Sequence, residues 1–144
     1  MQILWMAARS FLAVVAGIAA MTAVAFAFEI PLKWLMLRFF APSFPDEATL
    51  DNHVGWMLSQ SLYTLPALML GGYVAAWLAP RRPLAHAVAM AIVQELLTVA
   101  LMFDPPHPVP PYIWAFGLIA TPLAIIFGGY LRTRARPAAA EQRA

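Results

Sequence analysis

Long apolar runs separated by short polar segments dominate the chain. The runs cover about residues 10–30, 56–79, 84–103 and 112–131. Each approaches or exceeds the roughly 20 helical residues that cross about 30 Å of hydrocarbon. Because lipid offers no water to the backbone, a segment that spans it must satisfy its N–H and C=O groups within a helix. The pattern therefore predicts an all-α fold, a four-helix transmembrane bundle.

The connections between the later runs are short and contain proline. Arg81 and Arg82 lie between two prolines in the turn after the second run, and residues 104–111 join the third run to the fourth. Proline fixes φ and removes a donor, so we expect both turns to be stiff. Pro31 follows the first run, and we expect a kink there, with an interfacial segment carrying Lys33 beyond it.

The basic residues indicate the orientation. Seven of the nine fall on one side of the predicted bundle: Arg9, Arg81, Arg82, Arg132, Arg134, Arg136 and Arg143. Lys33 and Arg38 fall on the other side, together with Asp46, Glu47, Asp51 and Asp104. The positive-inside rule therefore predicts a multi-pass protein of the bacterial inner membrane with both termini in the cytoplasm.

A cleaved signal peptide is the rival interpretation of residues 1–27. Ala25, Phe26 and Ala27 fit the pattern of a cleavage site after an apolar stretch. The stretch is longer than the usual apolar region of a signal peptide, however, and Arg9 lies unusually late for the basic region that precedes it. We therefore expect an uncleaved first span.

Composition favours lipid over water as the solvent. The chain is 62% hydrophobic and 11% charged, whereas soluble domains average about 45–50% apolar and about 25% charged residues. Its basic residues gather at helix ends rather than on one face, which argues against nucleic-acid binding. The absence of cysteine excludes disulfides, thiolate nucleophiles and thiolate metal ligands. No nucleophile motif or phosphate-binding glycine loop is recognisable, so we expect neither an enzyme nor a cofactor.

The second and fourth spans share a short motif, a threonine followed after seven residues by Gly-Gly-Tyr. The two copies are Thr64 with Gly71, Gly72 and Tyr73, and Thr121 with Gly128, Gly129 and Tyr130. Since both spans run in the same direction, the motif suggests two helical hairpins in parallel repeat. Alanines continue the glycines at intervals of four residues, and small residues let helices approach closely in lipid. We expect these glycines to pack helices rather than to bind a ligand.

A wider order of residues marks the last three spans. Residues 71–80 read Gly-Gly-Tyr-Val-Ala-Ala-Trp-Leu-Ala-Pro, His86 follows, Pro111 and Trp114 open the fourth span, and residues 128–132 read Gly-Gly-Tyr-Leu-Arg. In this order the chain resembles a loose group of small bacterial four-span membrane proteins of unknown function. The resemblance implies the topology and carries no activity.

Glu95 is the ionisable residue predicted nearest the bilayer centre. It lies about eleven residues beyond Leu84, roughly 16 Å along a helix. An acidic group at that depth costs about 2.5–3.5 kcal/mol, so such residues usually face the bundle interior and mark a site or pathway. Polar residues expected near it are Gln94 and Thr98 on the same span, Thr121 on the fourth and Thr64 on the second.

Two hypotheses for Glu95 stay open. In the first, a protonated Glu95 hydrogen-bonds to Thr or Gln across helices in an accessory or structural subunit, which forms a homo-oligomer or joins a larger membrane-protein partner. In the second, it binds a proton or cation in a minimal transporter or channel. A conduit needs polar groups at several depths on one face, and few occur between Thr98 and the cytoplasmic end. The sequence therefore favours the first hypothesis.

The external side and the C-terminus complete the predictions. Glu29 and Lys33 are one helical turn apart, so we expect an interfacial ion pair. Carboxylates and histidines occur on this side in no recognised metal motif, so no metal site is predicted: Asp46, Glu47, Asp51, His53, Asp104 and His107. Asp51, Asn52 and His53 can instead cap a helix that starts near Val54. We expect residues 132–144 to form a disordered cytoplasmic tail.

Overall fold

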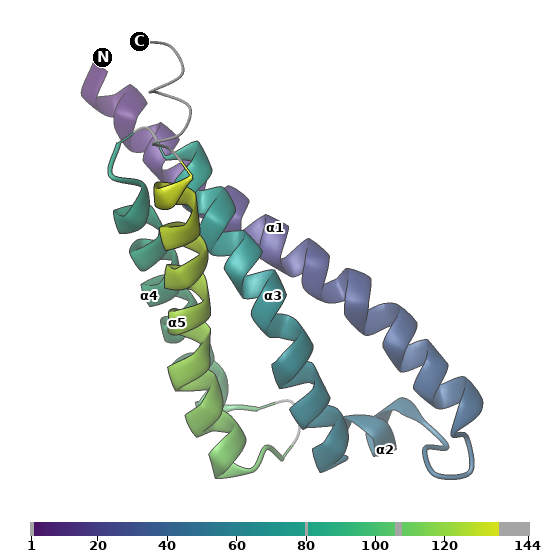
Figure 1. Cartoon of the computed structure of the whole chain (residues 1–144). Coiled ribbons are helices and arrows are strands. Elements are labelled where there is room, and N and C mark those ends of the chain that lie inside the picture. The colour runs from purple at the N-terminus through teal and green to yellow at the C-terminus, as the bar shows by residue number, and fades with distance from the viewer. Residues whose placement is uncertain (1, 80, 106–107, 136–144) are drawn as a thin grey trace.

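The computed structural model of the chain describes residues 2–79, 81–105 and 108–135. These residues form four long helices and one short helix (Figure 1): α1 (Gln2–Phe39), α2 (Glu47–Asp51), α3 (Val54–Leu78), α4 (Pro83–Phe103) and α5 (Pro111–Arg134). The four long helices are long and apolar enough to cross a membrane. The predicted all-α four-helix bundle is therefore confirmed.

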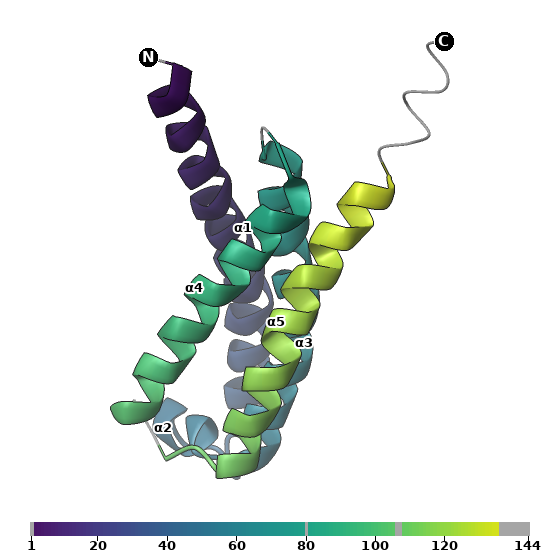
Figure 2. The same ribbon diagram turned by 90° about the vertical axis from the view of Figure 1, so that its left-hand side faces the viewer.

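Consecutive long helices run in opposite directions. The start of α1, the α3–α4 turn and the end of α5 lie at one end of the bundle, and α2 and the α4–α5 connection lie at the other (Figures 1 and 2). The most extensive contact joins α3 to α5, while α1 packs mainly on α3, and α4 mainly on α5. The bundle thus consists of two antiparallel pairs, α1 with α3 and α4 with α5, joined through α3 and α5.

Helix α1 is longer than the span expected from the sequence. It continues through Pro31 to Phe39, over 38 residues. A single proline removes one N–H donor, and the helix-favouring residues on both sides of it maintain the remaining hydrogen bonds. At 1.5 Å per residue α1 is about 57 Å long. It diverges from α4 and α5 toward the end where α2 lies (Figure 1).

Prolines begin the last two helices. Pro83 opens α4 and Pro111 opens α5, positions at which a missing N–H costs no intrahelical hydrogen bond. Arg82, the residue before α4, has a left-handed backbone with a φ of 51°. The connection is short, since α3 ends at Leu78 and α4 begins at Pro83.

Glycines in the later turns of α3 and α5 bring the helices into backbone contact. A Cβ on Gly71 would lie 2.8 Å from the carbonyl oxygen of Gly17 in α1. A Cβ on Gly72 would meet the backbone of Ile125, and one on Gly128 would meet the backbone of Met69. The α3–α5 contact is therefore reciprocal, because each glycine faces the residue three positions before the other.

The other glycine of the fourth-span motif packs on a different helix. A Cβ on Gly129 would meet the Cβ of Ala87 in α4. All four glycines of the shared motif thus lie at helix contacts inside the bundle.

The C-terminal boundary differs from the expectation. Helix α5 continues to Arg134, three residues beyond the predicted end of the fourth span. Residues 136–144, the rest of the predicted tail, lie outside the described residues.

Candidate functional sites

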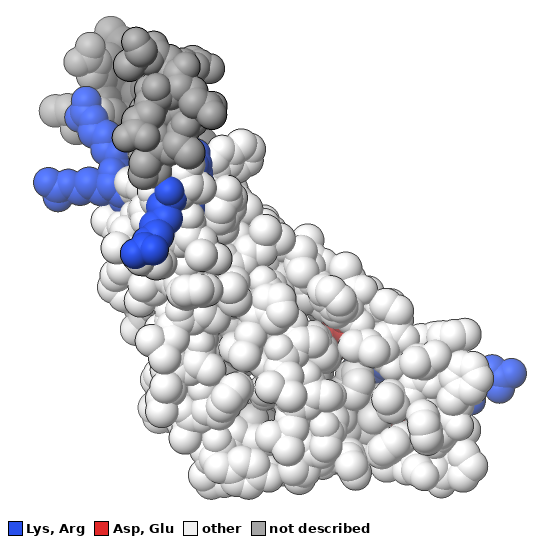
Figure 3. Space-filling model, in the orientation of Figure 1, with Lys and Arg blue, Asp and Glu red and all other residues white. Residues whose placement is uncertain are grey.

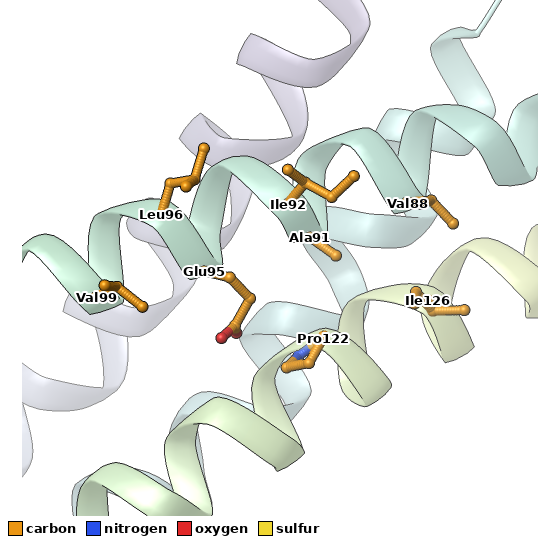
Figure 4. A pocket seen from close by; sticks show the side chains of 8 residues that line it. All are labelled: Val88, Ala91, Ile92, Glu95, Leu96, Val99, Pro122 and Ile126. Atoms are coloured by element: carbon orange, nitrogen blue, oxygen red, sulfur yellow. The ribbon is translucent and has the colours of Figure 1, made fainter.

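Glu95 lies near the middle of α4, twelve residues after Pro83 and eight before Phe103. Its side chain opens onto a groove of about 270 Å³ between α4 and α5 (Figure 4). Apart from Glu95 the lining is apolar: Val88, Ala91, Ile92, Leu96, Val99, Pro122 and Ile126. The structure therefore places a single carboxyl group in an otherwise apolar groove, near the middle of α4.

The carboxyl group of Glu95 has no hydrogen-bond partner among the described residues. Its Oε1 is buried and unpaired, and the side chain points toward Pro122 of α5 (Figure 4), a residue with no N–H to donate. The expected hydrogen bond to Thr or Gln across helices is therefore wrong within this chain. Thr98 instead donates to the Gln94 carbonyl of its own helix, and Thr64 to that of Gln60.

Gln94, Thr64 and Thr121 come together around a different cavity. It holds about 200 Å³ and is lined also by Met21 and Ala25 of α1. Successive helical residues point about 100° apart, so Gln94 faces the bundle interior while Glu95 faces the groove. Three of the four polar residues expected around Glu95 thus line a cavity that does not include Glu95.

A larger polar cavity lies toward the end of the bundle that carries α2. It holds about 410 Å³, and its polar lining comes from α1, α3 and α4: Glu29, Gln60, Ser61, Tyr63, Thr64 and Thr98. Thr64 lines both interior cavities, so polar side chains continue from the α2 end to the middle of the bundle. Gln60, Ser61 and Tyr63 were not among the site residues predicted from the sequence, although polar residues in the first turns of the second span were the available signal.

Lys33 pairs with residues of α2 and not with Glu29. Its Nζ lies 3.0 Å from Asp51 Oδ1 and 3.8 Å from Glu47 Oε2. The predicted Glu29–Lys33 ion pair is therefore wrong, because α2 folds back beside α1 and offers Lys33 two other carboxylates. Glu29 Oε1 instead accepts a hydrogen bond of 3.4 Å from Gln60 Nε2.

The capping residues of α2 and α3 also differ from the prediction. Asp46 caps α2, accepting hydrogen bonds of 2.7 Å from both the hydroxyl and the backbone N–H of Thr49. These two bonds hold the pKa of Asp46 below its ordinary value, and the bond from the Thr49 hydroxyl contributes most. His53 precedes α3 without a capping side-chain bond, and Asn52 donates to a carbonyl of α2. The expected cap of α3 by Asp51 or Asn52 is wrong because both side chains are engaged elsewhere.

Among the described residues no group of three or more His, Asp or Glu is placed to hold a metal ion. His107 lies outside the described residues.

Comparison of the chain with models of protein families, with curated proteins and with solved structures found no match. The resemblance to small bacterial four-span proteins therefore stays a prediction from the sequence.

Proposed function

We propose that this protein is a non-enzymatic accessory subunit of the bacterial inner membrane, with both termini in the cytoplasm, that receives a partner's transmembrane helix in the α4–α5 groove. The four apolar helices support the membrane location. Basic side chains gather beside the end that carries the termini (Figure 3), which supports the orientation through the positive-inside rule.

One observation carries the docking proposal, the buried and unpaired Oε1 of Glu95 in an otherwise apolar groove. A polar group left unpaired in hydrocarbon costs free energy, and a hydrogen bond across helices recovers part of it. A partner helix that brings a donor or acceptor to the level of Glu95 would pair this carboxyl group and cover the apolar lining at the same time.

A helix from a different subunit suits the groove better than a second copy placed on a two-fold axis. A two-fold contact sets the same surface patch of both copies face to face. Two hollows of about 270 Å³ would then oppose each other and leave the space unfilled. A single convex helix would fill it.

The second candidate function is a minimal proton- or cation-coupled transporter that uses Glu95. The argument for it is that Glu95 lies near the middle of a predicted membrane span, where ionisable residues often mark a pathway. In the structure Glu95 opens onto the groove, whereas Gln94, Thr64 and Thr121 line the interior cavity. A pathway through the interior polar residues would bypass Glu95. The geometry therefore favours the docking proposal.

Site-specific photo-crosslinking in native membranes tests the docking proposal. A photoreactive amino acid replaces Leu96 at the groove, and Leu62 of α3 is the matched control, since the two are 65% and 63% exposed and lie at similar distances from the α2 end of their helices. We expect an adduct from position 96 and none from 62. The adduct should persist with Glu95→Gln, which keeps a hydrogen-bonding side chain, and weaken with Glu95→Leu.

Three outcomes would count against the proposal. An equal adduct from both positions would indicate non-specific contact, and an adduct containing two copies of this chain would replace the partner by a homo-oligomer. If position 96 formed no adduct, the groove would be a lipid-facing surface.

Thiol labelling tests the orientation independently, because the chain has no native cysteine. In intact cells a membrane-impermeant maleimide should label Glu47→Cys and leave Arg134→Cys unlabelled until the membrane is opened. The reverse pattern would overturn the proposed orientation.

A further inference from the structure

Glu29 is a carboxylate that no described cation contacts directly, and Lys33 acts on it only at longer range. Lys33, one turn away, is held by Asp51 and Glu47, and among the described residues Glu29 forms no ion pair within 4 Å. Three carboxylates surround one ammonium group here, so the cluster has a formal charge of −2. The negative charge of Glu29 is therefore left with one long amide hydrogen bond, from Gln60.

The cavity beside Glu29 combines one charged group with aromatic and aliphatic side chains. Tyr63 and Trp114 supply aromatic rings, and Met57, Leu101 and Ile113 supply aliphatic surface. The Tyr63 hydroxyl is buried, and the Gln60 side chain lies beside it. Such a lining, mostly apolar with a few polar groups, is typical of small-molecule sites.

The cavity communicates with the α2 end of the bundle. Glu29 lines both the 410 Å³ cavity and a second hollow beside Lys33 and Glu47. Figure 3 shows a small patch of acidic surface recessed between uncharged side chains, between α1 and α3, with basic surface close by. At the opposite end of the cavities the interior is filled, since Gly71 packs against Gly17 and Met90. Access is therefore from the side on which α2 lies.

The lining indicates the class of ligand. A divalent metal ion takes several oxygen ligands, often with more than one carboxylate, and Glu29 is the one carboxylate that lines this cavity among the described residues. An organic ammonium group needs one counter-charge and is attracted to the faces of aromatic rings. Its alkyl substituents would pack on the aliphatic lining.

We propose that the Glu29 cavity binds a small monovalent organic cation of the amine or quaternary ammonium class, which enters from the α2 side of the membrane. Glu29 supplies the counter-charge, and Trp114 and Tyr63 contact the alkylated nitrogen. The site is separate from the Glu95 groove, so the proposal stands without the docking of a partner helix.

Binding to the purified full chain in lipid nanodiscs tests the proposal. The probes are tetramethylammonium, tetraethylammonium and benzyltrimethylammonium, each paired with its uncharged carbon isostere, and titration calorimetry against empty nanodiscs removes partitioning into lipid. We expect at least one cation to bind at least about tenfold more tightly than its isostere, as a desolvated charge contact with an aromatic lining allows.

Matched variants assign the binding to Glu29. Glu29→Gln removes the charge at almost constant shape and should weaken cation binding about tenfold or more while leaving the isostere unchanged. Asp104→Asn removes a carboxylate that is exposed and does not line the cavity, and should have no effect. Trp114→Leu should weaken cation binding with Glu29 in place, which gives a second reading if Glu29→Gln lowers the yield of folded protein.

The proposal is overturned if no cation binds the native chain more tightly than its isostere. Equal weakening by Glu29→Gln and Asp104→Asn would also overturn it, because the effect would then come from the general surface charge.

Discussion

Replacing Gly128 by alanine places a methyl group against the backbone of α3. The added Cβ would lie 2.7 Å from the carbonyl carbon of Met69 and 3.0 Å from its Cα. Ordinary contacts of a Cβ lie at 3.4–4 Å, and a backbone cannot rotate away as a side chain can. The substitution therefore has to separate α3 from α5, the most extensive helix contact of the bundle.

The size of the effect follows from two opposing terms. Overpacking a close contact costs about 1–3 kcal/mol, and an obstacle made of backbone favours the upper half of that range. Alanine recovers about 0.5–1 kcal/mol relative to glycine within a helix. We expect Gly128→Ala to lower the free energy of unfolding by about 1–2.5 kcal/mol.

Gly117 is the matched control in the same helix. A Cβ there meets nothing within 4 Å, so Gly117→Ala should leave stability unchanged or raise it by up to about 1 kcal/mol. Reversible unfolding in mixed micelles, followed by circular dichroism, measures both variants. If Gly128→Ala proved as stable as Gly117→Ala, the reciprocal α3–α5 backbone contact would be refuted.

Three further predictions concern α2 and the residues around it. Lys33→Met should lower the free energy of unfolding by no more than about 1 kcal/mol, as expected of a partly exposed ion pair. It should nevertheless speed amide hydrogen exchange at residues 47–51. Unchanged exchange would show that the ion pair does not hold α2 in place. Because the pKa of Asp46 is lowered in the folded chain, its cap stabilises α2 fully above the ordinary carboxyl pKa and is lost as the pH falls through the lowered one. Thr49→Val should raise the pKa of Asp46 toward the ordinary value in a carbon-13 titration, and an identical titration curve would contradict the assigned hydrogen bonds. Leu50 is 1% exposed, so Leu50→Ala should destabilise the chain by about 2–5 kcal/mol in the mixed-micelle unfolding measurement, and a loss under about 1 kcal/mol would contradict its burial.

The helices could be predicted because they depend on local chemistry. The length of each apolar run and the prolines that limit it are written in the sequence, and a run that spans lipid has no alternative to a helix. The second, third and fourth spans accordingly lie within about three residues of their predicted limits. Helix α1 instead begins eight residues before the predicted first span and ends nine residues after it. The extension past Pro31 could not be predicted, because a proline indicates a break without showing whether the residues around it keep their hydrogen bonds.

The partners of the polar side chains were decided by the tertiary structure. Gln94 and Glu95 are neighbours in α4, so their side chains point about 100° apart. Gln94 lines an interior cavity, whereas Glu95 lines an outer groove. Their positions in the sequence predict almost the same depth in the membrane and therefore do not show this difference. Lys33 lies one turn from Glu29 yet pairs with Asp51, because α2 folds back beside α1. Spacing along a chain sets depth in the membrane, whereas direction and contact depend on how the helices rotate and pack against one another, and only the assembled bundle fixes these.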